Sequence, residues 1–404
     1  MRKGKFKVED LKVKLIKDTF YNEAQTKKEL CDFIMKTDRL SMWTECRKFE
    51  DNFAKHQGAK NCSMFTSGST ANLALIQSLI NLKRLEKGDT VAFSAVTWST
   101  NVMPMLQLGL NIHPVDVEVD TLNSSAELFE KALEENPSIK AFFITNVLGF
   151  CSDIDKIADI CKSRGIILIE DNCESLGTIY KGKKLGSYGL AGTFSFYVGH
   201  HMSTIEGGAL CTDDAELDTM VKMVRSHGMD RNLDEDKKIK VREKFKLDDF
   251  YSRYTFYTLG YNLRPNEING FLGNNQLQYI DEIFRIRNEN FMKFISAVNK
   301  NDIVPIRYNH IDFVSNFAFP VICKNKTILN KYIKVFENAG IEIRPVVSGN
   351  MMNQIFIKDY VGSKKFDLPG AQKIHEDGFY FGNNPDMTKK EINIVIKAFK
   401  DASK

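Results

Sequence analysis

Apolar segments and helical segments alternate between residues 90 and 171, and this alternation limits the folds open to the chain more than any other feature. The apolar segments are predicted as strands, and the amphipathic stretches between them as helices. The predicted strands are residues 90–95, 112–115, 139–146 and 165–171, and the predicted helices begin near residue 101 and cover 124–135 and 154–163. The pattern predicts an α/β fold with a mostly parallel sheet covered by helices, and with its functional site at the carboxyl edge of the strands.

The chain is long enough, at 404 residues, for a large domain and a smaller one. Residues 5–38 are predicted to form an amphipathic lead-in helix, and residues 267–298 one long helix. We therefore expect a large domain over residues 1–265, followed by a linking helix and a small α+β domain over residues 266–404.

Charge and composition exclude several classes of function. The chain carries 56 basic and 52 acidic side chains, a formal net charge of +4, which indicates no role in binding nucleic acid or membranes. No apolar run reaches membrane-spanning length, and the basic residues 1–7 lack the apolar segment of a signal peptide, so we expect a cytoplasmic protein. The eight cysteines are never spaced as Cys-x-Cys or Cys-x-x-Cys, which favours reduced thiols and no metal site.

Residues 193–208 have the composition of a functional site rather than of a core. An apolar segment that contains Ser195 runs into a polar turn with two adjacent histidines, His200 and His201. The segment ends at Glu206-Gly207-Gly208, where the glycines permit a tight reversal of the backbone. Taken in isolation, two adjacent histidines also fit a solvated turn or a chance metal site.

A second polar turn, around Gly68 and Ser69, opens a helix whose later turns are apolar. Such a turn presents free amides at the positive end of a helix, which suits a phosphate group. A plain serine or threonine helix cap is the alternative interpretation of this turn.

The segment 193–208 resembles the active-site loop of the nucleotide-sugar aminotransferases, which are pyridoxal-phosphate enzymes of fold type I. In that family a serine precedes the turn, a lysine that binds the cofactor covalently follows, and the loop ends in Gly-Glu-Gly-Gly or a near relative. When Glu206-Gly207-Gly208 is matched to that ending, His200 falls at the place of the lysine. A smaller branch of the family carries histidine there, the GDP-4-keto-6-deoxy-D-mannose 3-dehydratases, and the chain resembles that branch.

The resemblance covers almost the whole chain, and it implies a particular fold and cofactor. The fold is the aspartate aminotransferase-like one, with a large domain built on a mostly parallel seven-stranded sheet and a smaller C-terminal α+β domain. The cofactor is pyridoxal 5'-phosphate (PLP) or pyridoxamine 5'-phosphate (PMP). Gly68, Ser69 and Ser195 are expected to hold its phosphate. Asn262 is expected to reach the cofactor phosphate of a neighbouring subunit, which implies a homodimer with shared active sites.

Three further residues are expected around the pyridine ring. Trp98 is expected to stack on the ring, although a core position explains it too. Asp171, in the run Glu-Asp-Asn-Cys-Glu-Ser, is expected beside the ring nitrogen, where a carboxylate keeps the nitrogen protonated; a helix cap is the alternative. Glu174 is expected near the ring hydroxyl.

Candidate substrate contacts are less specific. His227 and Arg264 are candidates for binding the amino donor or the sugar nucleotide, but a solvated loop explains both nearly as well. Arg344 is a candidate anion clamp for a substrate phosphate or a donor carboxylate, because guanidinium binds both as a fork. The Gly349-Asn350 pair resembles the sequence of the dehydratases, so Asn350 is also a candidate substrate-binding residue.

Histidine in place of lysine decides the expected chemistry. Imidazole cannot hold the cofactor by a stable covalent bond, so the cofactor is expected to be bound noncovalently and to act as PMP on a 4-keto-6-deoxy sugar nucleotide. His200, with an unperturbed pKa of about 6.5, is expected to take a proton from the cofactor methylene and to protonate the departing C3 hydroxyl. The products would be a 4-keto-3,6-dideoxy sugar, ammonia and PLP, and L-glutamate would regenerate PMP.

Several alternatives stay open at this point. His201 is the base if the loop register is shifted by one residue. A sugar aminotransferase that recruits Lys181, Lys183 or Lys184 is one rival, and a catalytically silent binding protein is another. A GDP-linked substrate is favoured over a CDP-linked one, with hexose and heptose both open. The related CDP-linked branch adds an iron–sulfur cluster, and the cysteine spacing here predicts none.

Overall fold

The structure is a computed structural model that describes residues 11–362 and 365–404. Its strands are β1 (Asn61–Phe65), β2 (Thr90–Ser94), β3 (Asn111–Val115), β4 (Ile139–Thr145), β5 (Ile167–Asp171), β6 (Ile179–Tyr180), β7 (Lys183–Lys184), β8 (Ala191–Ser195), β9 (Gly208–Thr212), β10 (Ala318–Ile322), β11 (Ile343–Pro345) and β12 (Gly378–Gly382). Seven of them form one sheet in the order β1-β9-β8-β5-β4-β2-β3. Strand β9 runs antiparallel to β1 and β8, and all other neighbouring strands of this sheet are parallel. The predicted α/β fold with a mostly parallel seven-stranded sheet is confirmed.

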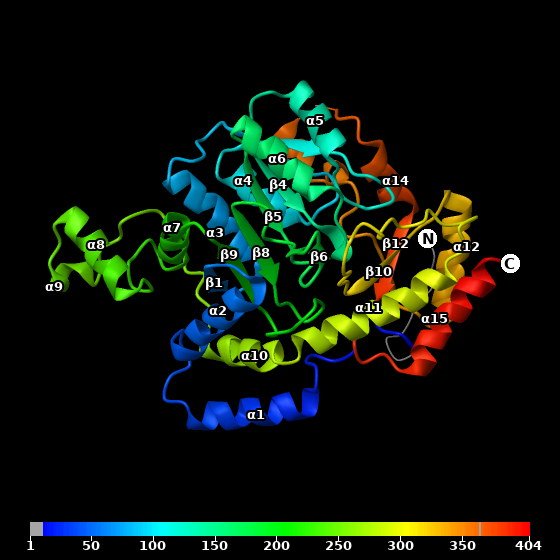
Figure 1. The fold of residues 1–404 in the computed structure, drawn as a ribbon, viewed down its shortest axis with the longest axis horizontal. Coiled ribbons are helices and arrows are strands. Elements are labelled where there is room, and N and C mark those ends of the chain that lie inside the picture. The colour runs from blue at the N-terminus through cyan, green and yellow to red at the C-terminus, as the bar shows by residue number, and fades with distance from the viewer. Residues whose placement is uncertain (1–10, 363–364) are drawn as a thin grey trace.

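Helices cover this sheet and connect it to a second, smaller sheet (Figure 1). The α-helices are α1 (Glu23–Lys36), α2 (Thr44–Gln57), α3 (Gly68–Asn81), α4 (Met103–Gln107), α5 (Ala126–Glu135), α6 (Ile154–Arg164), α7 (Ala215–Arg225), α8 (Glu235–Phe245), α9 (Asp249–Ser252), α10 (Glu267–Leu277), α11 (Ile280–Ala297), α12 (Lys326–Asn338), α13 (Ile357–Val361), α14 (Pro369–Asp377) and α15 (Lys389–Ala402). The second sheet, β10-β12-β11, is antiparallel and packs with α12, α14 and α15 as the expected C-terminal α+β unit.

The two sheets share part of one hydrophobic core. A single cluster of buried side chains includes Phe142 on β4, Phe291 on α11, Phe319 on β10 and Phe399 on α15. This cluster crosses from one sheet to the other, so close packing joins the two sheets. The domain boundary placed between residues 265 and 266 stays a prediction.

Two predicted helices are corrected by the structure. Residues 11–22 are not helical, because Val13 is buried in the core and the amides of Lys12 and Val13 donate to the Gly340 carbonyl; residues 5–10 lie outside the described part of the chain, as do the basic residues 1–7. The helix begins only after Asn22, which has a left-handed φ of 57°. The predicted helix over 267–298 is two helices, α10 and α11, that meet around residue 279.

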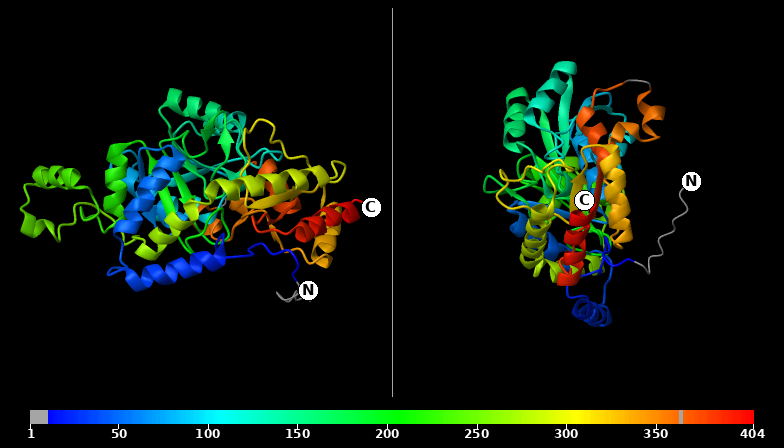
Figure 2. Two further views of the ribbon diagram at one scale, coloured as in Figure 1. Left: turned by 60° about the horizontal axis from the view of Figure 1, so that its bottom comes forward. Right: turned by 90° about the vertical axis from the view of Figure 1, so that its right-hand side faces the viewer.

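The excursion between α7 and α10 leaves the body of the molecule. Helices α8 and α9 project as an arm beyond α7 in Figure 1 and in the left view of Figure 2. The arm exposes large apolar side chains, among them Phe250, Tyr254 and Phe256, which are 63–77% exposed.

No helix within residues 11–362 and 365–404 is both long and apolar enough to cross a membrane.

The buried carboxylate of Glu170 fixes the carboxyl end of β5. One oxygen accepts the amides of Tyr188 and Gly189 at 2.7 and 2.8 Å, and the other accepts the Gly186 amide at 2.7 Å and the Asn146 side-chain amide at 3.3 Å. Burial raises the pKa of Glu170, whereas the backbone amides act in the opposite direction. The next residue along β5 is Asp171, so these four hydrogen bonds hold the backbone that carries it.

We predict that Glu170→Gln lowers the stability of the protein, because an amide NH₂ would face two of the four donors. Each donor left without an acceptor costs about 1–3 kcal/mol. The midpoint of urea unfolding should fall well below that of the control variant Glu130→Gln, whose side chain is exposed on α5. Equal midpoints for the two variants would show that the four donors do not require the carboxylate.

Candidate active site

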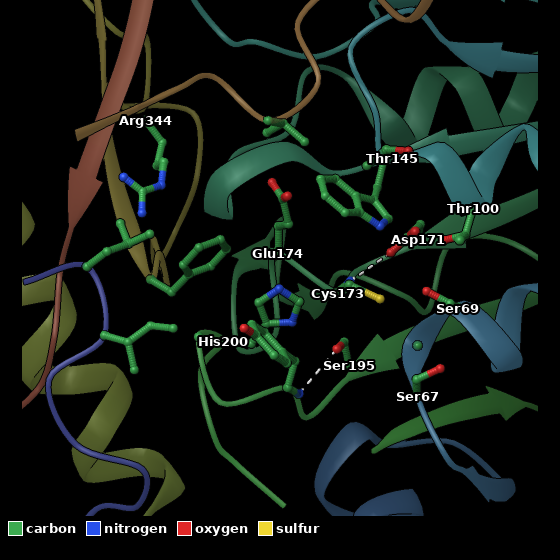
Figure 3. A pocket seen from close by; sticks show the side chains of 18 of the residues that line it. Ser67, Ser69, Thr100, Thr145, Asp171, Cys173, Glu174, Ser195, His200 and Arg344 are labelled. Carbon is green, nitrogen blue, oxygen red and sulfur yellow. Dashed lines mark hydrogen bonds between the residues drawn. The ribbon is translucent and has the colours of Figure 1, made fainter. Parts of the chain in front are cut away.

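A cavity of about 520 Å³ opens at the carboxyl edge of the large sheet, on the side that faces the small sheet. Thr145, Asp171 and Ser195, which are the last residues of β4, β5 and β8, line it. Eight of the predicted site residues line this cavity: Gly68, Ser69, Trp98, Asp171, Glu174, Ser195, His200 and Arg344. Figure 3 shows His200 and Glu174 in the middle of the view, with Asp171, Ser195 and Ser69 on one side and Arg344 on the other.

The first turn of α3 forms one end of the cavity. Ser67 caps the helix, because its hydroxyl accepts the Thr70 amide at 3.1 Å while the Thr70 hydroxyl accepts the Ser67 amide at 3.0 Å. A side chain at Gly68 would lie 2.9 Å from the Ser195 Cβ and 2.7 Å from the Cys173 sulfur, so only glycine permits this approach. The turn therefore brings a helix N-terminus and the Ser195 hydroxyl together, which suits a phosphate.

Asp171 lines the same cavity, on the side of Ser69 and Ser195, and is 3% exposed. Its two carboxylate oxygens accept the Asn72 side-chain amide at 3.1 Å and the Cys173 backbone amide at 2.9 Å. Within the described chain no lysine, arginine or histidine forms an ion pair with it. A buried carboxylate without a cationic partner suits a protonated ring nitrogen of a bound ligand. Asn72, on the buried face of α3, orients this carboxylate and was missed in the sequence, where it resembles an ordinary helix residue.

Glu174 accepts the Leu148 amide at 3.0 Å. Desolvation raises the pKa of Glu174 to about 8, and the charge of Asp171 adds to the shift. Around neutral pH Glu174 is therefore largely protonated, and it can donate a hydrogen bond to an oxygen in the cavity.

The two adjacent histidines have different surroundings. His200 lines the cavity, and its ring lies 5.1 Å from the Phe317 ring and 5.8 Å from the Tyr197 ring, measured between centroids. Desolvation lowers the pKa of His200 to about 4, so the imidazole is neutral at pH 7. His201 is 2% exposed, packs against Phe317 and Phe284, and has its Nε2 3.1 Å from the Ser315 carbonyl oxygen. It does not line the cavity.

The small sheet and the N-terminal segment close the far side of the cavity. Arg344 on β11 pairs with Glu342 at 2.6 Å, and the other carboxylate oxygen of Glu342 accepts the Leu15 amide at 2.9 Å. Leu15 and Tyr380 line the cavity beside them. Neither could be found from the sequence, because only the tertiary fold brings residues near both chain ends to the carboxyl edge of the large sheet.

Four predicted residues do not line this cavity. Three of them lie at the base of the arm. Asn262 forms a backbone bridge with Ser226, and its side-chain oxygen accepts a hydrogen bond from Arg264 Nε at 3.0 Å. The backbone amide of His227 donates to the Tyr261 carbonyl. Asn350 is buried, where its side chain accepts the Met352 amide at 3.0 Å and donates to Gln372 at 3.2 Å. The predicted roles of these four residues stay predictions.

The three lysines considered as alternatives lie away from the cavity. Lys181 pairs with Asp155, Lys184 donates to the His56 carbonyl, and the Lys183 ammonium lies 5.7 Å from the centroid of the Tyr188 ring. No lysine in the described part of the chain lines the cavity, and no group of three or more His, Cys, Asp or Glu there is placed to hold a metal ion.

Comparison with known proteins agrees with this geometry. The family described as DegT/DnrJ/EryC1/StrS aminotransferases matches residues 22–400. The GDP-4-keto-6-deoxy-D-mannose 3-dehydratase of Escherichia coli O55:H7 is 34% identical over 372 residues, which cover 91% of this chain and 95% of that protein.

Solved structures extend the comparison. A mutant of GDP-4-keto-6-deoxymannose-3-dehydratase, in which asparagine replaces a histidine, with bound GDP-perosamine, matches with a TM-score of 0.87 at 31% identity over 96% of this chain and 100% of that one. The same enzyme with a trapped PLP-glutamate geminal diamine matches with a TM-score of 0.86 at 30% identity, with the same shares covered. The chain thus belongs to the DegT/DnrJ/EryC1/StrS aminotransferase family, with the fold of the type I pyridoxal-phosphate enzymes.

Proposed function

We propose that the protein is a PMP-dependent 3-dehydratase that removes the C3 hydroxyl of a nucleotide-linked 4-keto-6-deoxy sugar. The observation that carries the proposal is that His200, and no lysine among the described residues, lines the cavity that contains Asp171 and Ser195. The relatives named above support the reaction, since they are named for it. Bound there noncovalently, the cofactor supplies an amine for the 4-keto carbon and a ring that takes up the electron pair of a breaking C–H bond.

The residues of the cavity fit this cofactor. The Gly68 and Ser69 amides and the Ser195 hydroxyl would hold the phosphate at the start of α3. Asp171 would hold the proton on the ring nitrogen, and Trp98, which is 54% exposed and lines the cavity, would cover one face of the ring. Glu174, in its protonated form, would donate a hydrogen bond to the ring hydroxyl.

His200 would move protons between two atoms. As a neutral imidazole it takes the proton from the carbon next to the cofactor amine, and the imidazolium so formed protonates the departing C3 oxygen. The low pKa of His200 makes its conjugate acid a strong proton donor to that oxygen. The rings of Phe317 and Tyr197 pack against the imidazole.

The names of the relatives support the expected partners. We expect a GDP-linked rather than a CDP-linked sugar, either GDP-4-keto-6-deoxy-mannose or a related hexose or heptose, and L-glutamate as the amino donor. Arg344, half exposed at the far side, would bind a substrate phosphate or the donor carboxylate. The sugar would lose one oxygen overall, PMP would become PLP with release of ammonia, and glutamate would restore the amine form.

An aminotransferase that uses another lysine is the second candidate, because the family includes such enzymes. It requires Lys181, Lys183 or Lys184 in the cavity, and these side chains lie elsewhere in the structure. A catalytically silent binding protein is the third candidate, and it predicts cofactor binding without turnover.

We predict that His200→Asn abolishes the reaction while the protein still binds the cofactor. Purified protein would be incubated with PLP, glutamate and GDP-4-keto-6-deoxymannose, and the sugar nucleotide analysed by mass spectrometry. The wild type should form a product one oxygen lighter, and the variant should form it at least about 100-fold more slowly, because general acid–base catalysis is lost.

The matched variant His201→Asn tests whether His200 or His201 is the catalytic base. Its product formation should stay far above that of His200→Asn, because His201 does not face the cavity. Full dehydration by His200→Asn would remove His200 from the mechanism. An amine in place of the keto oxygen, together with borohydride trapping of the cofactor on a lysine, would instead establish the aminotransferase.

We further propose that the protein acts as a homodimer with shared active sites. Asn262, His227 and Arg264 lie outside the cavity of their own chain, at the base of an arm whose apolar side chains are exposed. A second copy of the chain would bury these side chains and bring Asn262 to the neighbouring cofactor phosphate.

Mixing two inactive variants tests the shared site. Asn262→Ala and His200→Asn, unfolded and refolded together in equal amounts, should recover about a quarter of the wild-type activity, because half of the dimers are mixed and each of these has one intact site. The control mixture of Ser195→Ala with His200→Asn should recover none, since every site keeps one defect. Equal activity in both mixtures would contradict the shared site.

A further inference from the structure

A buried arginine outside the cavity wall contacts the backbone of His200. Arg287 lies on α11 and is 4% exposed. In the described part of the chain its guanidinium forms no ion pair with a carboxylate, and its hydrogen-bond acceptors are three backbone carbonyls. A buried charge paired only with dipoles is expensive, and in return the guanidinium satisfies three carbonyls that an apolar side chain would leave without this donor. The role of Arg287 therefore follows from the segments to which those carbonyls belong.

The three carbonyls belong to segments that meet behind the cavity. Arg287 Nη2 donates to the His200 carbonyl at 3.1 Å, and Nη1 donates to the carbonyls of Asn383 and, at 3.4 Å, Phe317. The Asn383 side-chain amide donates back to the Arg287 carbonyl at 2.8 Å and to the Asn316 carbonyl at 3.2 Å. One guanidinium thus joins the histidine loop to α11, to the start of β10 and to the end of β12.

This arrangement bears directly on the imidazole. The Phe317 ring is one of the two aromatic rings against which the His200 ring packs. Arg287 therefore fixes the backbone of both members of this ring pair. If the two backbones move relative to each other, the imidazole shifts relative to the cavity, and misplacement of a catalytic group by about 1 Å costs on the order of 100-fold in rate.

The charge of Arg287 acts on His200 as well. Burial lowers the pKa of Arg287 to about 9, and the charge of Asp386 opposes that change, so the guanidinium is protonated at pH 7. Desolvation lowers the pKa of His200, the carboxylate of Asp171 raises it, and Arg287 lowers it further. Other titratable side chains lie on both sides of His200. Those on the cavity wall are Cys173, Glu174, Tyr197, Glu206, Glu342, Arg344 and Tyr380, and those on the Arg287 side are His201, Asp18, Tyr21 and Asp386.

We propose that Arg287 is a positioning residue for His200, which holds the carbonyls of His200 and Phe317 and so places the neutral imidazole at the cavity. The proposal rests on the proposed function for its catalytic consequence. The effect of Arg287 on the His200 side chain can be measured without substrate and does not depend on the proposed function.

The first measurement compares steady-state kinetics of Arg287→Met, Arg287→Lys and the control Arg285→Met. Arg285 is exposed on the same helix and pairs with Glu289, so its variant should retain wild-type rates. Arg287→Met should lower kcat about 100-fold with little change in KM for the sugar nucleotide. Arg287→Lys keeps the charge but loses the fork that spans the carbonyls, so kcat should fall by about tenfold. A wild-type kcat in Arg287→Lys would overturn the positioning role, and this variant decides the question if Arg287→Met does not fold.

The second measurement follows the His200 side chain by NMR of protein labelled with ¹³C in its histidines, with the signal assigned by its loss in His200→Asn. The wild-type signal should show neutral imidazole from pH 7.5 down to pH 5, because the pKa of His200 is about 4. Removal of the nearby positive charge should raise the titration midpoint in Arg287→Met, whereas Arg287→Lys should titrate as the wild type does.

A merely structural role gives a different result. In that case Arg287→Met lowers the unfolding midpoint, cofactor affinity and kcat together, and Arg287→Lys keeps the wild-type kcat, and this outcome would overturn the proposal. Activity of His200→Asn at the wild-type level would overturn the proposed function instead. Even then, the His200 titration could still shift in Arg287→Met. Failure of the proposed function can therefore be distinguished from failure of the role proposed for Arg287.

Discussion

The close approach of α3 to the ends of β8 and β9 is the constraint on which the rest of the site depends. A side chain at Gly208 would lie 2.3 Å from the Ser67 carbonyl carbon, and one at Gly68 would collide with Ser195 and Cys173. Because both positions are glycine, the first turn of α3 lies directly against the strand ends. The same helix then carries Asn72 to Asp171. One packing contact therefore sets the positions of both the helix N-terminus and the Asp171 carboxylate at the cavity.

The ionisation states in the cavity follow from burial more than from ion pairing. Desolvation raises the pKa of Glu174 to about 8 and lowers that of His200 to about 4, so near neutral pH Glu174 is mostly a neutral acid and His200 a neutral base. Asp171 has no cationic side chain paired with it in the described chain. A ligand with a protonated ring nitrogen would supply the missing charge, and Arg287 lies behind His200 rather than in the cavity.

The C-terminal unit contributes more to this site than its distance in the sequence suggests. Phe317, Glu342, Arg344 and Tyr380 come from around the small sheet, and they line a cavity whose other wall is the edge of the large sheet. One hydrophobic core packs against both sheets. The cavity therefore has two faces with different chemistry: a polar face that suits a cofactor and an aromatic and ionic face that suits a substrate.

The sequence by itself determined the α/β class, the family resemblance and the residues at the carboxyl edge of the sheet, because these depend on local patterns such as strand–helix alternation and the run from Ser195 to Gly208. Only the tertiary structure decided which of two adjacent histidines faces the cavity, since a one-residue difference in a turn depends on packing against Phe317 and Ser315. It likewise decided that Leu15 and Tyr380 line the site, and that residues 11–22 are not helical. These outcomes depend on contacts between segments hundreds of residues apart, such as Leu15 with Glu342, and no local periodicity encodes them.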